Sequence, residues 1–289
     1  MIKEQNTSGS IRSLNCRGVG LELGKRTLIM GIVNVTPDSF SDGGKFFSPQ
    51  TALEQAGQLI SEGADILDIG AESTRPGHRE ICAEEEWARL EPVLKELLKN
   101  VRIPISIDTQ KSIVAEKALR IGVHIINDIW GLQKDLSMAK VVGSYGAPIV
   151  VMHNRDNTNY QDLVGEIIQF FKKSIAFALT CGVKEDQIVL DPGIGFGKTT
   201  KQNIEVINRL GELKSLGFPL LLGVSRKSVI GNTLSLPVEE RLEPTIALGT
   251  LGIAAGVDIL RVHDVWQNKK AALMTDQVLR CKYGENDES

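Results

Sequence analysis

The chain has 289 residues, of which 42 % are hydrophobic and 24 % are charged, the balance of a globular protein with a sizeable core. A formal net charge of -3 lacks the basic field that nonspecific nucleic-acid binding needs, so nucleic acid is not predicted as a partner. No run approaches the roughly 18 consecutive apolar residues of a membrane span, so no membrane association is predicted either.

Short apolar runs alternate along the chain with longer segments of helical spacing. The runs, which we interpret as β-strands, are TLIMGIVNV (27–35), DILDIG (65–70), IPISID (103–108), VHIIND (123–128), APIVVMH (147–153), QIVLD (187–191), FPLLLGV (218–224) and DILRVH (258–263). Segments between them, such as PQTALEQAGQLISEG and QKSIVAEKALRIG, end in glycine, as helices often do. Eight strand–helix units predict an α/β fold, a (β/α)8 TIM barrel, because a doubly wound sheet usually has fewer strands.

The barrel is predicted to form a single domain over residues 16–280, between a loosely ordered N-terminal tail (1–15) and a flexible C-terminal tail (281–289). The first residues, MIKEQNTSGSIRS, are polar where a signal peptide needs an apolar core. Four scattered cysteines form no C-x-x-C pair, so neither a zinc site nor a disulfide framework is indicated. These features predict a cytoplasmic protein.

Polar residues follow all eight predicted strands. Catalytic groups of a TIM barrel lie at the carboxyl ends of the strands, so these positions are the candidate site. They include Asn34, Asp68, Asp108, Asn127, Asp191, Lys227, Arg261 and His263. Asp and Asn are also common as turn formers and helix caps, which explains any single position better than it explains all eight.

Two chemistries separate among these residues. Asp108, Asn127, Asp191 and Lys227 combine acceptors with donors, as a pocket for a flat heterocycle with amide and amine groups requires. A second set offers donors suited to phosphate oxygens and predicts an oxyanion or diphosphate site: Asn34, Arg75, Arg261 and His263.

Some residues have competing interpretations. His263 could be a barrel-interior residue with satisfied hydrogen bonds, and His153 has structural packing as an equally good explanation. The stretch DPGIGFGKTT (191–200) resembles a phosphate-binding loop, but its spacing is one residue short and Pro192 stands where glycine is needed. We instead expect its glycines to bend a loop so that Phe196 covers a ligand, although a plain turn is the simpler alternative.

Eight segments together resemble bacterial dihydropteroate synthase, the folate-pathway transferase that sulfonamide drugs inhibit. They are MGIVNVTPDSFSDGG, GADILDIGAESTRPG, ISIDTQKS, INDIWG, VVMHN, LDPGIGFGKT, LLGVSRKSVIG and RVHDV, in this order from about residue 30 to 265. The resemblance implies condensation of 6-hydroxymethyl-7,8-dihydropterin diphosphate with 4-aminobenzoate, which yields 7,8-dihydropteroate and diphosphate and uses Mg²⁺.

The same resemblance assigns the site residues. The pterin pocket would consist of Asp108, Asn127, Ile129, Met152, Asp191, Gly223 and Lys227. Diphosphate would contact Asn34, Arg75, Arg261 and His263, with Asn34 also beside the magnesium. The 4-aminobenzoate side, where sulfonamides would bind, would consist of Thr74, Pro76, Phe196, Lys227 and Ser228. The implied catalytic set is Asn34, Asp42, Arg75, Lys227, Arg261 and His263.

The family mechanism implies that the bond to diphosphate breaks first and that the amine attacks a pterin cation. This path needs leaving-group stabilisation and exclusion of water more than a strong base. We therefore interpret VTPDSFSDGG (35–44) as a lid, with Gly43 and Gly44 as a hinge and with Asp38 or Asp42 facing metal or cation. A turn-rich surface loop is the alternative.

Two rival functions stay open. A corrinoid-linked methyltetrahydrofolate methyltransferase would use a similar pterin pocket but would not need the S-T-R-P-G loop. A non-catalytic pterin-binding barrel would keep the deep pocket while losing Asn34, Arg261 or His263, and all three are present. Family members are usually homodimers through barrel helices, and the apolar segment IALGTLGIAAG (246–256) fits either such an interface or a buried helix.

Overall fold

A computed structural model describes residues 12–35, 49–72 and 80–280 of the chain. Its strands are β1 (Arg12–Cys16), β2 (Val19–Leu23), β3 (Leu28–Asn34), β4 (Ile66–Gly70), β5 (Ile105–Asp108), β6 (Ile125–Asp128), β7 (Ile149–Met152), β8 (Ile188–Asp191), β9 (Leu221–Leu222) and β10 (Ile259–Val262). Its α-helices are α1 (Pro49–Ser61), α2 (Ala83–Asn100), α3 (Ser112–Ile121), α4 (Ser137–Tyr145), α5 (Leu163–Thr180), α6 (Thr200–Asn208), α7 (Leu210–Leu213), α8 (Ser228–Leu234), α9 (Leu242–Ala254) and α10 (Val265–Arg280). Short 3₁₀ helices are η2 (Glu185–Gln187), η3 (Lys214–Leu216) and η4 (Val238–Glu240).

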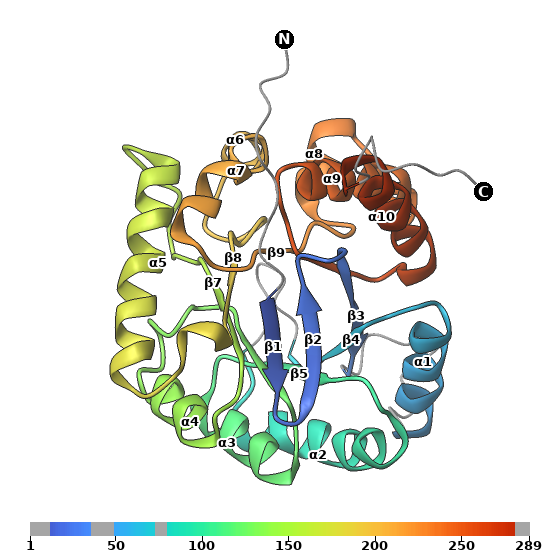
Figure 1. The fold of residues 1–289 in the computed structure, drawn as a ribbon, viewed down its shortest axis with the longest axis vertical. Coiled ribbons are helices and arrows are strands. Elements are labelled where there is room, and N and C mark those ends of the chain that lie inside the picture. Colours follow the sequence, from blue (N-terminus) through green and yellow to red (C-terminus); the bar gives the residue numbers. More distant parts are fainter. Residues whose placement is uncertain (1–11, 36–48, 73–79, 281–289) are drawn as a thin grey trace, which may run out of the picture.

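Strands β3 to β10 form one parallel sheet in the order β8-β7-β6-β5-β4-β3-β10-β9. A parallel bridge between Leu190 of β8 and Leu220, just before β9, joins its two edges. There the Leu190 N–H donates to the carbonyl of Pro219 at 2.9 Å. The helices lie around this ring of strands (Figure 1). The predicted (β/α)8 TIM barrel is confirmed, with its strands at the eight predicted runs.

Some helices end at glycines, as the sequence predicts. Helix α3 ends at Gly122, whose φ of 113° lies in the left-handed region and whose N–H bonds to the carbonyls of Ala118 and Leu119. A residue with a Cβ adopts this conformation only with strain, which is why glycine is common at this position. The chain then turns directly into β6.

Alternate strand residues face opposite sides, and both sides are buried. The outward set, including Ile29, Leu67, Ile107, Val151 and Leu190, belongs to one apolar cluster with the surrounding helices. Parallel strands covered on both faces are continuously apolar, which explains the unbroken hydrophobic runs. The inward set fills the barrel and divides into two layers, described below.

Strands β1 and β2 form an antiparallel hairpin that crosses the middle of the barrel in Figure 1. Arg17 and Gly18 connect them, and both have positive φ, as a type I′ turn requires. Leu14, Cys16 and Leu23 of the hairpin pack on the inward apolar residues at one end of the barrel. The prediction that residues 1–15 form a loose tail is therefore wrong for residues 12–15, because they belong to strand β1, in which Leu14 is buried. Residues 1–11 and 281–289, the rest of the two predicted tails, lie outside the described residues.

In the described part of the chain, none of the helices has the length and apolar character that crossing a membrane requires.

Candidate active site at the carboxyl ends of the barrel strands

The barrel interior changes from apolar to polar along the strands. At the end that the hairpin covers, the inward residues are all apolar: Met30, Ile66, Ile125, Val150, Val189, Leu221 and Ile259. Side chains on a strand return to the same face every second residue, so the next inward layer lies two residues further along. On β4, β6, β8 and β10 it consists of Asp68, Asn127, Asp191 and Arg261, and Ser106 of β5 stands beside Asp68 in the strand register. We call Asp68, Ser106, Asn127, Asp191 and Arg261 the polar layer.

Asp108 lies one step above this layer on β5. The register places it between Gly70 and Asn127. Because Gly70 has no side chain, the space beside Asp108 is open: a Cβ at Gly70 would stand 3.6 Å from the Asp108 Cβ. The predicted pterin residues Met152 and Gly223 fall in the same interior, two residues after Val150 and Leu221.

Arg261 connects two carboxylates across the barrel. Its Nε donates to Oδ2 of Asp68 at 2.6 Å, and its Nη2 donates to Oδ2 of Asp108 at 2.8 Å. Asn127 Nδ2 donates to the same Asp68 oxygen at 3.1 Å. The Asp68 side chain is fully buried, so these donors take the place of water as its hydrogen-bond partners. Arg261 is thus placed between the predicted heterocycle and anion sites.

Three buried polar atoms of this region have no hydrogen-bond partner among the described residues: Asp68 Oδ1, Ser106 Oγ and Asn127 Oδ1. Buried polar groups are nearly always paired, since leaving one unpaired costs about 1–3 kcal/mol. Clustered at the mouth of a barrel, these atoms mark a pocket prepared for a polar ligand. Two of the three acceptors are carbonyl-type oxygens, which suit ligand N–H groups.

Two buried acidic residues of the site have raised pKa values. Burial raises the pKa of Asp108 to about 7, against the opposing influence of Arg261. Burial also raises the pKa of Asp191, while Lys227 and the Gly193 N–H, which donates to Asp191 Oδ1 at 2.7 Å, act in the other direction. Shifts of this kind concentrate at functional sites, because burial there is not fully compensated.

Lys227 lies beside Asp191 at the start of α8. Burial lowers its pKa to about 8, and the charge of Asp191 opposes that change. Its ammonium donates to the carbonyl of Ile194 and stands 4.8 Å from the centre of the Phe196 ring. Lys227 and Phe196, predicted to share the 4-aminobenzoate side, are therefore neighbours. The preceding residue Arg226 points elsewhere, in an ion pair with Asp264.

The remaining predicted residues lie around the mouth. Asn34 ends β3 and is half-buried, Ile129 is buried just after β6, and Ser228 is exposed at the first position of α8. His263 Nδ1 lies 3.0 Å from the hydroxyl of Ser225, which also accepts the His263 N–H. The predicted residues Asp42, Thr74, Arg75 and Pro76, and the proposed lid with Asp38, Gly43 and Gly44, lie outside the described residues.

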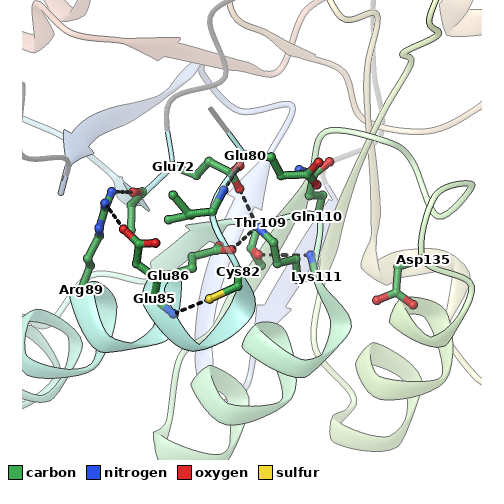
Figure 2. Close-up of polar contacts among 12 residues, drawn as sticks. Glu72, Glu80, Cys82, Glu85, Glu86, Arg89, Thr109, Gln110, Lys111 and Asp135 are labelled. Atoms are coloured by element: carbon green, nitrogen blue, oxygen red, sulfur yellow. Dashed lines mark hydrogen bonds and ion pairs between the residues drawn. The ribbon is translucent and has the colours of Figure 1, made fainter. Parts of the chain in front are cut away.

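A buried ion network supports the loops beside the site. Lys111, in the β5–α3 connection, donates to Glu72 Oε2 at 2.6 Å and to Glu86 Oε2 at 2.7 Å, and Figure 2 shows these side chains. Glu86 is fully buried on α2, and burial raises its pKa. The network joins Glu72, two residues after β4, to the loop that follows Asp108, so it fixes two neighbouring strand ends.

Sequence reasoning missed several contributors. Asp68 was seen as a strand-end residue but not assigned to a ligand site, and Ser106 was not considered. Asp68 lies two residues after the inward Ile66, and Ser106 lies between the outward Ile105 and Ile107, so the alternation could have identified both. For His153, packing is confirmed: the ring is buried 4.8 Å from the Phe170 ring, edge to face.

Among the described residues no group of three or more His, Cys, Asp or Glu side chains has a metal-binding arrangement. Asn34 offers one amide oxygen at the mouth. Mg²⁺ commonly takes one or two protein oxygens and completes its octahedron with water and substrate phosphate. The donor set therefore fits a magnesium ion that arrives with a phosphorylated ligand.

The fold and the site define a TIM barrel whose buried polar groups gather at the carboxyl ends of the strands, the arrangement of a barrel enzyme. A family model described as "Pterin binding enzyme" matches residues 30–263. The dihydropteroate synthase of Clostridium beijerinckii is 52 % identical over 259 residues, 89 % of this chain and 96 % of that protein. The chain belongs to the pterin-binding enzymes and, within them, to the dihydropteroate synthases.

Solved structures agree with this membership. Dihydropteroate synthase from Clostridium difficile, determined in the presence of pteroic acid, is 56 % identical with a TM-score of 0.88, covering 90 % of this chain and 100 % of that one. The Xanthomonas albilineans enzyme with 4-aminobenzoic acid is 38 % identical with a TM-score of 0.90, covering 94 % of this chain and 100 % of that one. The family resemblance predicted from the strand-end motifs is confirmed.

Proposed function

We propose that the polar layer binds the ring of 6-hydroxymethyl-7,8-dihydropterin diphosphate and that the protein, a transferase of folate biosynthesis, joins it to 4-aminobenzoate. The products are 7,8-dihydropteroate and diphosphate. The observation that carries the proposal is the trio of buried acceptors without partners, at Asp68, Ser106 and Asn127. A pterin presents amine, amide and ring N–H donors along one edge, the complement that these oxygens require.

Each part of the pterin pocket has a distinct task. Asp108, Asn127 and Asp191 accept from or donate to the polar ring edge, and Lys227 donates to a ring acceptor. Ile129 and Met152 supply buried apolar contact with the ring face. A ligand lacking the polar edge would leave several buried groups unpaired, which excludes analogues strongly.

The anionic end of the substrate would lie at the mouth. Arg261, Asn34 and His263 are the described residues that we assign to diphosphate, together with Arg75. Asn34 would hold the Mg²⁺, which when bound supplies positive charge that stabilises the departing diphosphate. Each well-aimed donor to such a developing charge contributes on the order of 2.7–4 kcal/mol.

The charges around the ring favour a cationic pterin after the bond to diphosphate breaks. Three carboxylates, Asp68, Asp108 and Asp191, face two cations, Lys227 and Arg261, and both cations are mostly buried. A low-dielectric pocket with this excess of acidic groups stabilises positive charge on the ring. The arylamine of 4-aminobenzoate is already nucleophilic, so it attacks without a strong base.

The second substrate would bind beside Phe196, Lys227 and Ser228, with Thr74 and Pro76 completing that side. The Phe196 ring and the Lys227 ammonium are adjacent, which gives an aromatic surface next to a positive charge. This pairing suits an aromatic carboxylate. Sulfonamides are also arylamines, and we expect them to compete here.

The proposal is tested by measuring diphosphate release from the pterin diphosphate with and without 4-aminobenzoate, and with Mg²⁺ or EDTA. We expect release only when both 4-aminobenzoate and Mg²⁺ are present. Tight pterin binding with no release would favour the rival functions, the corrinoid-linked methyltransferase or the non-catalytic pterin-binding barrel. The residues at the mouth that we assign to diphosphate argue against both rival functions, because neither of these functions requires a diphosphate site.

We also infer a homodimer through α9 and α10, which are neighbours in Figure 1. Large apolar side chains are exposed on these two helices: Leu251, Trp266, Leu273, Met274, Val278 and Leu279. Apolar surface that recurs along two adjacent helices indicates a protein interface. Sedimentation velocity should give a dimer for the wild type and a monomer for Met274→Asp. A monomeric wild type at micromolar concentration would contradict the inferred homodimer.

A cytoplasmic location stays a prediction, consistent with free Cys16, Cys82 and Cys181.

A further inference from the structure

The loop between β8 and α6 forms one wall of the site. The carbonyl of Ile194 accepts from the Lys227 ammonium, and a Cβ at Gly195 would stand only 3.3 Å from the Lys227 Cδ. The Phe196 ring lies 4.8 Å from the same ammonium. The position of Lys227 between the two substrates therefore depends on the conformation of this loop.

Lys198 is buried inside this loop, with 8 % of its surface exposed. Its ammonium donates to the carbonyl of Gly193 at 3.0 Å and to that of Phe196 at 3.0 Å. The third neighbour is His153 Nδ1, at 2.9 Å. An ammonium has three N–H donors and no acceptor, so the three partners use all of them.

The protonation state of His153, which directly follows β7, matches this arrangement. Because the ammonium can only donate, His153 Nδ1 must accept, which leaves the ring neutral with its proton on Nε2. Burial and the charge of Lys198 hold the pKa of His153 far below its usual value. While Lys198 carries its charge, the imidazole is therefore an acceptor that ties the loop to the end of β7.

The loop also packs without a gap on the segment after β7. Gly193 has a φ of 66°, and a Cβ there would stand 1.9 Å from the His153 carbonyl. Gly197 has a φ of 54°, and its carbonyl accepts from the Tyr160 hydroxyl at 2.8 Å. Tyr160, in the segment after β7, thus supports the outer side of the loop.

We propose that Lys198 is a positioning residue for the condensation: its ammonium fixes the carbonyls of Gly193 and Phe196 and thereby holds Phe196 and Lys227 in place for 4-aminobenzoate. This inference rests on the proposed function of the site. Lys198 acts through its neighbours, because its donors are all used inside the loop. Burial of an ammonium is costly, and it lowers the pKa of Lys198 to about 7, with Asp191 opposing the change. A loop needed only for packing would be closed at less cost by an apolar side chain.

The pterin pocket should depend much less on Lys198. Asp68, Asp108 and Asn127 lie on strands whose register does not involve the loop. Asp191 and Lys227 do contact the loop, so a part of the pterin affinity depends on it. Loss of the ammonium should therefore affect the two substrates differently: binding of 4-aminobenzoate weakens, whereas binding of the pterin is largely kept.

The test compares Lys198→Met with Lys201→Met, the same change at an exposed position three residues later, in the first turn of α6. We expect Lys198→Met to raise the KM for 4-aminobenzoate about tenfold or more, since small displacements of a positioning group have effects of this size. The Kd of the pterin diphosphate, measured by titration without 4-aminobenzoate, should change less than about threefold. Lys201→Met should leave both within about twofold.

His153→Leu is the second variant, because it removes one of the three acceptors. We expect a smaller rise in the same KM, about threefold, with the pterin Kd preserved. An unchanged KM in Lys198→Met, or an equal loss of both affinities, would overturn the inference. If Lys198→Met does not fold, a normal KM in His153→Leu would overturn it and a selective rise would support it. Absence of 4-aminobenzoate-dependent release by the wild type is a separate outcome that rejects the proposed function and this inference together.

Discussion

The two layers of the barrel interior differ in chemistry although the same strands build them. The lower layer, around Ile66 and Val150, is apolar and closed by the β1–β2 hairpin. The polar layer two residues above it holds buried charges and three polar atoms without partners. The lower layer gains stability from burial, whereas the polar layer gives up stability to keep groups ready for a ligand. Each strand therefore carries a stabilising half and a binding half.

Arg261→Ala should have the largest effect. The change removes the donor to Asp68 and Asp108 and a predicted diphosphate contact in one step. We expect kcat/KM for diphosphate release to fall on the order of 10³-fold, as for loss of a transition-state donor. Unfolding free energy should also fall, by about 3–5 kcal/mol if both carboxylates stay charged, and by less if they become protonated.

Arg261→Lys is the matched control, because it keeps the charge but not the two-pronged geometry. It should recover stability more fully than activity. Turnover close to the wild-type value in Arg261→Ala would contradict the assignment of this arginine to the site.

Ile66→Ala probes the lower layer on the same strand as Asp68. The side chain is fully buried, so its truncation should lower the free energy of unfolding by about 2–5 kcal/mol in urea titrations. The Kd of the pterin diphosphate should stay within about twofold at temperatures where the variant is folded. A large loss of pterin affinity with unchanged stability would show that the two layers are not separate in function.

Asp108→Asn should change how the stability of the protein depends on pH. Burial raises the pKa of Asp108 from 3.8 to about 7, so the folded protein binds this proton more tightly than the unfolded chain does. The resulting stabilisation is complete below about pH 4 and is lost as the pH rises through about 7. In Asp108→Asn this part of the decline, about 4 kcal/mol for a pKa change of this size, should be absent, which Tm measured across the window would show. Parallel Tm profiles of the two proteins would show that Asp108 ionises normally.

The sequence predicted the parts of this arrangement that depend on local pattern. Eight apolar runs ending in polar residues indicate the barrel and the rim at which its ligands bind. The separation of Asp108, Asn127 and Asp191 from Asn34 and His263 followed from side-chain chemistry. The family was indicated by the resemblance of eight segments, and the comparisons support it.

The features that sequence reasoning missed depend on contacts between distant residues. Asp68 meets Arg261 across 193 positions of the chain, and no local pattern reveals that pair. Lys198 follows a glycine-rich run that suggests an exposed or phosphate-binding lysine, yet three buried acceptors surround it. The hairpin, by contrast, had a local signal, the alternation of Leu14 and Cys16 before the turn at Arg17 and Gly18.

A crystal structure of the protein with 6-hydroxymethyl-7,8-dihydropterin diphosphate and Mg²⁺ would test the central claim most directly. We predict that the ring lies in the polar layer, within hydrogen-bond distance of Asp108, Asn127 and Asp191, and that its N–H groups bond to the acceptors now without partners. The diphosphate should point toward Asn34, Arg261 and His263. A ring bound elsewhere, with Asp68 Oδ1 and Asn127 Oδ1 still unpaired, would contradict the division of the barrel into a stabilising and a binding layer.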